Sequence, residues 1–228
     1  MSKVQLSCSN LTLSSLKTLV SIQDDGIQPY SWTDVDDIVL SGSVQRQIAD
    51  IQARLRNDRP QLMNEATVWA RAIYPLLMLA ERDSVRAWSQ IPINGSYPSF
   101  EIHGVADGVL GSGFAGDLEA PYLVVVEAKR GIEAKNPQYQ LYGEMLAAAR
   151  MNWELDSQGQ DPQIIFGCYT IADVWTFTRG EVGGMDSDRP FLLLESSREY
   201  GSKLEAEIIV KILQTIVSDR LNTLSKAA

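Results

Sequence analysis

The chain has 228 residues, with 29 acidic and 20 basic side chains that give a formal net charge of -9. Apolar residues make up 45% and charged residues 21%, an ordinary globular composition that argues against disorder. The negative charge excludes a protein that binds nucleic acid nonspecifically through excess positive charge. The single histidine, His103, excludes most mechanisms that need two imidazoles. Cys8 and Cys168 are too far apart in the sequence for a zinc-ligand cluster, and free cytosolic thiols are favoured over a disulfide.

The domain organisation follows from length and local composition. The length fits one domain with a small extension. Residues 1–33 are rich in Ser and Thr and contain the turn signals Asp25-Gly26 and Pro29, which predict an N-terminal extension. Residues 34–228 are predicted to form a single domain. The N-terminus has no apolar signal-peptide core, and no apolar run approaches the roughly 20 residues of a membrane span. We therefore expect a cytoplasmic protein without a membrane partner.

Helical periodicity dominates the first part of the predicted domain. Apolar residues recur at near-helical spacing over 34–55, and the Ser-Gly-Ser sequence at 41–43 should divide this stretch in two. The segment 57–60 reads as a helix stop followed by a helix start. A helix is predicted over 61–77, where Pro75 should kink or end it.

The pattern then changes to strands. The segment 122–129 is apolar on both faces, which is typical of a central strand covered on both sides. The alternation of helices and strands predicts an α/β or α+β domain with a mixed sheet. The predicted strands span 100–109, 122–129, 163–169, 174–178 and 190–194, and the predicted helices span 136–153 and 204–221.

Two charged residues end the most apolar predicted strand. Side chains two apart on a strand share a face, so Glu127 and Lys129 should stand side by side. Charges at such a place cost free energy unless they are paired, bind a metal or reach solvent. Asp107 lies on the preceding predicted strand, and the 19 residues between it and Glu127 allow a turn and a return. Two carboxylates suit Mg²⁺, and a lysine beside them can orient an attacking water or neutralise developing phosphorane charge.

The sequence reads GVADG at 104–108 and VVVEAK at 124–129, and this pair resembles the PD-(D/E)XK (restriction-endonuclease-like) nuclease superfamily. The resemblance includes an acidic residue on the preceding predicted helix, Glu65, and a glutamine on the following one, Gln140. Ala106 stands where the superfamily motif has proline, a change that the superfamily tolerates. The resemblance covers about half of the chain and implies an αβββαβ core, an α/β (α+β) fold in which helices flank a central mixed sheet.

The resemblance also implies roles for individual residues. Asp107 and Glu127 would ligate Mg²⁺, with the Ala128 carbonyl as a further ligand and Mn²⁺ as a substitute ion. Glu65 would bind the metal directly or through water, and Lys129 would activate or position the attacking water. The implied activity is Mg²⁺-dependent hydrolysis of phosphodiester bonds, with DNA favoured over RNA as the partner. The implied catalytic residues are Glu65, Asp107, Glu127, Lys129 and Gln140.

The charge distribution suggests which side would face DNA. Residues 44–90 carry seven basic and five acidic groups, whereas the segments on either side are net negative. Arginine forks suit phosphate oxygens. Gln140 lies in the first turns of its helix, where free backbone N–H groups favour phosphate, and Gln138 is the alternative glutamine. The predicted nucleic-acid-binding residues are Arg54, Arg56, Arg130, Lys135 and Gln138.

Other interpretations stay open. Glu127 and Lys129 alone could form a strand-end ion pair, and Asp107-Gly108 alone could be a hairpin turn. A nuclease-like fold without turnover could serve as a nucleic-acid-binding or assembly module, although the complete acid-acid-lysine set argues against this. An acidic protein-interaction domain would bind no metal, and Asp107→Ala would then change stability alone. A homodimer is also compatible with the sequence.

Overall fold

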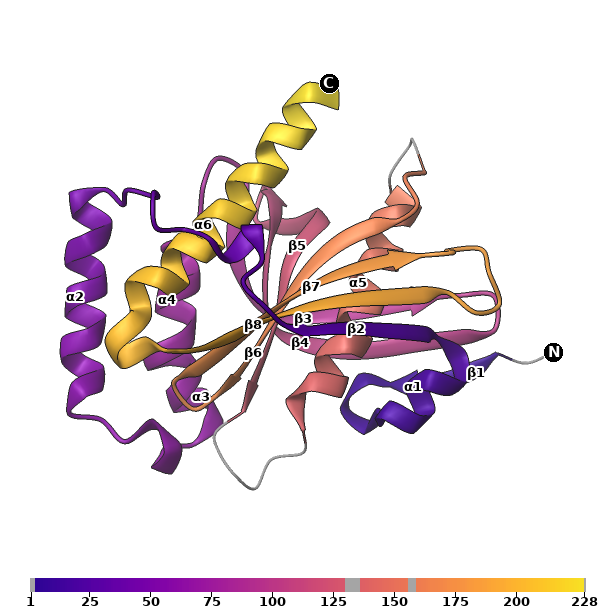
Figure 1. The fold of residues 1–228 in the computed structure, drawn as a ribbon, viewed down its shortest axis with the longest axis horizontal. Coiled ribbons are helices and arrows are strands. Elements are labelled where there is room, and N and C mark those ends of the chain that lie inside the picture. Colours follow the sequence, from indigo (N-terminus) through magenta and orange to yellow (C-terminus); the bar gives the residue numbers. More distant parts are fainter. Residues whose placement is uncertain (1–2, 130–135, 156–158, 228) are drawn as a thin grey trace.

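The computed structural model describes residues 3–129, 136–155 and 159–227, which are built around one eight-stranded sheet (Figure 1). The strands are β1 (Val4–Ser7), β2 (Ser21–Ile27), β3 (Val85–Ser96), β4 (Phe100–Phe114), β5 (Asp117–Lys129), β6 (Gln163–Ile171), β7 (Val174–Gly183) and β8 (Phe191–Gly201). The helices are α1 (Leu13–Leu19), α2 (Gly42–Arg56), α3 (Glu65–Val68), α4 (Tyr74–Met78), α5 (Pro137–Leu155) and α6 (Ser202–Ala227). Short helical turns lie at Cys8–Asn10 (η1), Ser31–Thr33 (η2), Pro60–Leu62 (η3) and Trp69–Ile73 (η4).

The sheet is mixed. Its order is β1-β4-β5-β6-β7-β8-β2, and β3 also pairs with β4. The pairs β3–β4, β4–β5, β6–β7 and β7–β8 are antiparallel. The central pair β5–β6 is parallel. A parallel pair needs a crossover connection, and α5 provides it.

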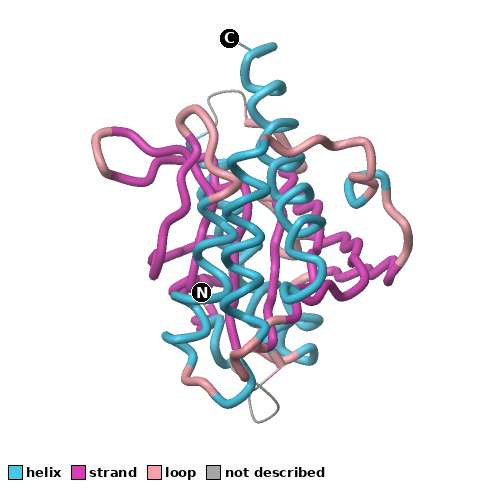
Figure 2. Tube along the Cα trace, turned by 90° about the vertical axis from the view of Figure 1, so that its left-hand side faces the viewer, coloured by secondary structure: helices cyan, strands magenta, loops and turns pink. Residues whose placement is uncertain are grey.

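Helices cover both faces of this sheet. Val125 of β5 packs in one core cluster with α5, and its neighbours Val124 and Val126 pack in a second cluster with α2, α4 and α6. All three valines are fully buried, which explains why β5 is apolar on both faces. Figure 2 shows the second helical layer in front of the strands. The structure therefore confirms the expected mixed α/β architecture, with a mixed central sheet flanked by helices.

The predicted helix over 61–77 is divided into shorter pieces. Asn64 caps α3 by accepting a hydrogen bond of 2.8 Å from the Thr67 N–H, so the regular helix starts only at Glu65. The wide π-helical turn η4 follows, and α4 then begins with Pro75 in its first turn, where the missing N–H costs little. Within the described part of the chain, no helix is long and apolar enough to cross a membrane.

The first 33 residues contribute two strands to the sheet. β1 pairs in parallel with β4, and β2 pairs in parallel with β8 at the other end. These two strands were not predicted, and neither was β3, which pairs with β4 along most of its length. The sequence of β3 includes Pro92 and Asn94-Gly95, which obscure the alternation typical of a strand.

The sheet forks along β4. On one side, β4 pairs with β5 from Phe114 back to Gly108, and with β1 from His103 back to Phe100. Residues 104–107 lie between these two ladders, so an opening separates the end of β1 from β5. Gly108 forms the last β4–β5 pair at the inner end of the fork, and the Trp69 ring packs so closely against it that a side chain there would collide with the ring. Asp107 therefore stands where β4 and β5 part.

Candidate active site

Glu127 lies near the end of β5 and is completely buried. Its Oε1 forms an ion pair with Lys129 Nζ. Its Oε2 accepts a hydrogen bond of 2.7 Å from the side-chain amide of Gln140 on α5. A buried carboxylate is tolerated only when partners replace its lost hydration. Glu127 thus draws together the end of β5 and the first turns of α5.

A second buried carboxylate belongs to the same network. Glu144 lies one helical turn after Gln140, is completely buried, and accepts a hydrogen bond of 3.0 Å from the Gln140 amide nitrogen. The amide nitrogen of Gln140 thus bridges Glu127 and Glu144. Glu144 was not predicted as a site residue. The sequence signal for it is that Glu144 is the single charged residue within 141–149. All residues of this run are buried.

Asp107 is held across the fork by the backbone of β5. The Ala128 N–H donates to its Oδ2 at 2.8 Å, and the Gln90 side-chain amide donates to its Oδ1 at 3.1 Å. The β4–β5 ladder ends one residue earlier, at Gly108 and Val126. The Asp107 carboxylate therefore accepts the hydrogen bond that a backbone carbonyl of β4 would accept if the ladder continued. This bond fixes the strand that carries Glu127. Gln90 was not predicted as a site residue. Its φ of 54° lies in the left-handed region, which is uncommon for a residue other than glycine.

Lys129 links the buried carboxylates to an exposed one. Its Nζ lies 3.8 Å from Glu65 Oε1, in addition to its contact with Glu127. Its side chain is 19% exposed, compared with 46% for Glu65. Glu65 is the first residue of α3, so the short helix created by the Asn64 cap places it beside the end of β5.

The electrostatics of this network are dominated by burial. Burial, followed by the charge of Asp107, raises the pKa of Glu127 to about 7, and the opposing effect of Lys129 is smaller. Burial, followed by the charge of Glu127, raises the pKa of Glu144 well above its usual range. Burial lowers the pKa of Lys129, but Glu127, Glu65 and Asp107 together raise it by more. The two buried carboxyl groups therefore hold their protons to higher pH than usual, beside a lysine that stays protonated.

The structure brings together the five residues predicted to be catalytic. They are Glu65, Asp107, Glu127, Lys129 and Gln140. Gln138 lies apart from this cluster and donates a hydrogen bond of 2.6 Å to the Tyr142 hydroxyl. Arg54 and Arg56 are exposed on the last turn of α2, without a contact to the cluster among the described residues. Arg130 and Lys135 lie outside the described residues.

The donor set can be compared with what Mg²⁺ requires. In the part of the chain that is described, no group of three or more His, Cys, Asp or Glu side chains is arranged to hold a metal. Mg²⁺ is commonly bound by only one or two carboxylates and keeps several waters. Asp107 and Glu127 supply two carboxylates. The Ala128 carbonyl faces the Asp107 side, because the N–H and C=O of one strand residue point the same way. These oxygen donors fit a divalent cation.

Comparison with known proteins supplies no independent assignment. No protein-family model and no curated protein sequence matches this chain. The geometry of the cluster is therefore the basis for any functional argument.

The raised pKa of Glu127 predicts how stability depends on pH without divalent metal. Its folded pKa of about 7 lies above the ordinary 4.5, so the folded state retains a proton that the unfolded chain loses in between. Stability should fall as pH rises from about 4.5 to 7 and level off above that. In Glu127→Gln, the decrease in the free energy of unfolding over this pH range should be smaller by about 1–3 kcal/mol. Urea unfolding in a chelating buffer at several pH values measures this free energy.

The exposed Glu207, paired with Lys211 on α6, provides the matched control. Glu207→Gln should keep the wild-type pH dependence. An identical slope in wild type and Glu127→Gln would show that Glu127 has an ordinary pKa.

Proposed function

We propose that this chain is a Mg²⁺-dependent nuclease that hydrolyses phosphodiester bonds, with DNA as its substrate. The observation that carries the proposal is the convergence of Asp107, Glu127 and Lys129 where two antiparallel strands part, with Gln140 facing them from the next helix. The element order α4–β3–β4–β5–α5–β6 also supports a restriction-endonuclease-like αβββαβ core. β3 supplies the third strand that this core requires.

In this proposal Asp107, Glu127 and the Ala128 carbonyl would hold Mg²⁺, and Glu65 would bind it directly or through water. The ion would supply positive charge to a phosphoryl oxygen and to the attacking water. Two protein contacts orient these ligands: the Ala128 N–H holds Asp107, and the Gln140 amide holds Glu127. Such fixed supporting contacts reduce the reorganisation needed when substrate binds.

Lys129 acts as a cation in this scheme. Its pKa is raised overall by the surrounding carboxylates, so it keeps its proton near neutral pH and donates hydrogen bonds. Its partial exposure lets the ammonium reach a bound phosphate or the attacking water. It thereby positions the water and stabilises the negative charge that develops on the phosphoryl oxygens.

One observation favours a second candidate function. Both oxygens of Asp107 and both oxygens of Glu127 already interact with other protein groups. Two carboxylates that are already engaged by protein groups are also compatible with a nuclease fold that has lost turnover and serves as a nucleic-acid-binding or assembly module. Cleavage assays separate the two functions, because only the enzyme shows metal-dependent turnover.

Lys129→Ala should reduce cleavage by at least about 100-fold, because the substitution removes the cation that stabilises the developing charge. The measurement is cleavage of supercoiled plasmid and of linear single- and double-stranded DNA with Mg²⁺ or Mn²⁺, with RNA as the comparison substrate. The exposed Lys17 is the matched control, and Lys17→Ala should cleave like wild type. Absence of metal-dependent cleavage by wild type, or equal cleavage by Lys129→Ala, would remove the enzyme assignment.

Charge reversal of Arg54 and Arg56 should weaken DNA binding. Both are exposed at the end of α2, from which the chain leads directly to α3 and Glu65 (Figure 1). If each contacts a phosphate, the double reversal should reduce the slope of log affinity against log salt by roughly 1–2. Binding should be measured in the Lys129→Ala background, so that cleavage does not interfere.

Arg46, in the first turns of the same helix, is the matched control. Arg46→Glu should leave the salt slope nearer to that of the parent. An unchanged affinity and slope after reversal of Arg54 and Arg56 would exclude this end of α2 from the DNA-binding surface.

A further inference from the structure

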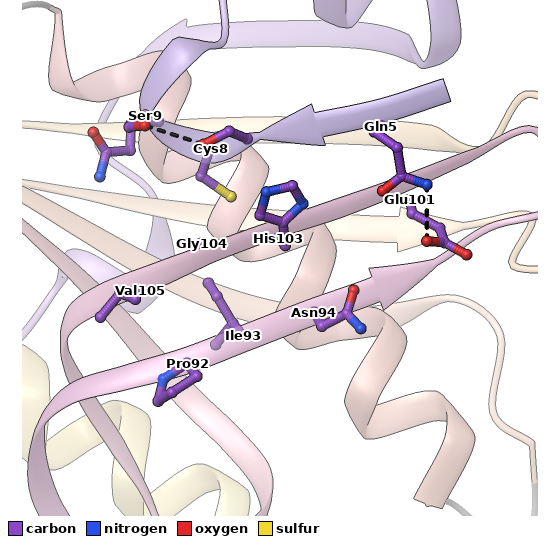
Figure 3. Close-up of a pocket in the computed structure, with 12 residues that line it drawn as sticks. Gln5, Cys8, Ser9, Pro92, Ile93, Asn94, Glu101, His103, Gly104 and Val105 are labelled. Atoms are coloured by element: carbon purple, nitrogen blue, oxygen red, sulfur yellow. Dashed lines mark hydrogen bonds between the residues drawn. The ribbon is translucent and has the colours of Figure 1, made fainter. Parts of the chain in front are cut away.

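A pocket opens on the sheet next to the candidate active site. Its volume is about 660 Å³, and its walls come from β1, β3 and β4 (Figure 3). Gln140 also lines it, and the same side chain holds Glu127. The pocket is therefore adjacent to the proposed catalytic cluster and shares one residue with it. Nothing in the proposed catalytic roles uses the remainder of its lining.

The pocket is organised by strand register. Ser7 of β1, His103 of β4 and Asn94 of β3 stand opposite one another in a cross-strand row. His103 and Asn94 are exposed, and Figure 3 shows the imidazole between β1 and β3. Gly104 lies in the gap of the fork, where an added Cβ would approach Cys8 Sγ to 2.9 Å. The absence of a side chain at Gly104 lets β1 and η1 approach β4 closely at this gap.

The lining is almost uncharged. None of the described residues that line the pocket is Lys or Arg, so it offers no cation to a phosphate. Its one carboxylate, Glu101, already accepts a hydrogen bond of 2.9 Å from the Gln5 amide and lies 4.0 Å from Lys3 Nζ. The rest consists of amides, hydroxyls, an imidazole and apolar groups such as Pro92 and Val105. A flat, neutral, hydrogen-bonding heteroaromatic ring fits this chemistry.

We propose that the pocket binds an unpaired nucleobase of the substrate strand, next to the scissile phosphate at the site of Asp107, Glu127 and Lys129. This inference rests on the proposed function, because it takes the ligand to be part of a nucleic acid. The His103 ring provides a stacking face, and the Asn94 amide provides both a donor and an acceptor for the base edge. A base can enter a pocket only after it leaves the helical stack. The substrate is therefore single-stranded, or an end or gap whose bases are unpaired.

The test measures oligonucleotide binding by full-length Lys129→Ala protein in the presence of Mg²⁺. The ligands are one single-stranded DNA and a set of copies in which a single abasic site is moved along the strand. At one or two positions, the abasic site should weaken binding by roughly 5- to 100-fold, the range expected for loss of one stacked base. A blunt duplex of the same sequence should bind more weakly than the single strand.

His103→Ala and Asn94→Ala identify the pocket as the place where this base binds. Each should weaken binding of the intact strand, yet cause little further loss with the strand that is abasic at the sensitive position. Gln28→Ala, at an exposed amide beside β2 on the opposite edge of the sheet, is the matched control and should change neither affinity. Thermal unfolding of each variant verifies that the fold is intact.

The outcomes separate this inference from the proposed function. If wild type cleaves DNA but no abasic position matters, or His103→Ala weakens intact and abasic strands equally, the pocket assignment is overturned and the nuclease assignment stands. If wild type does not cleave but the abasic effect still disappears in His103→Ala, the nuclease assignment fails and the pocket remains a nucleobase site. Absence of any oligonucleotide binding overturns the pocket assignment.

Discussion

The burial of the Glu127 carboxylate is the constraint around which this part of the molecule is arranged. The residue ends a strand whose valines pack against helices on both faces, so water cannot compensate its charge. Lys129 and Gln140 replace the lost water on its two oxygens. The same need explains the polar first turns of α5, a helix that is otherwise buried through most of its middle. The burial of one carboxylate therefore accounts for the polar residues around it on β5 and α5.

The fork in the sheet places a second carboxylate near this buried charge. β4 pairs with β5 in its second half and with β1 in its first half, and the gap between these ladders contains Asp107. The Ala128 N–H binds the Asp107 carboxylate where a regular ladder bond would otherwise lie. An interruption of regular pairing thus places a second carboxylate beside the first. The adjoining pocket lies along the part of β4 that pairs with β1 and β3, beyond the point where β5 leaves the ladder.

Local sequence patterns predicted two kinds of element: a strand that is apolar because both of its faces are buried, and helices with a strong apolar periodicity. β5 was recognised from its apolar run. The helix predicted over 136–153 corresponds to α5, at whose start Asn136 accepts a hydrogen bond from the Gln138 N–H. Strand parity alone predicted that Glu127 and Lys129 share a face, and they form an ion pair. β1 and β2 were missed because they pair with strands distant in sequence. β3 was missed because Pro92 and Asn94-Gly95 obscure its alternation. Glu144 was missed because its contact with Gln140 has meaning only once α5 is packed on β5.

The central claim is that Asp107 and Glu127 together hold a divalent cation. Calorimetric titration of Mg²⁺ or Mn²⁺ into metal-free protein at pH 6.5, in buffers with different ionisation enthalpies, tests it most directly. Saturable binding should release protons, because the Glu127 pKa near 7 leaves it partly protonated before the metal binds. Asp107→Asn should abolish this binding while the exposed Glu207→Gln retains it. Absence of binding to wild type, or equal binding by Asp107→Asn, would contradict the account.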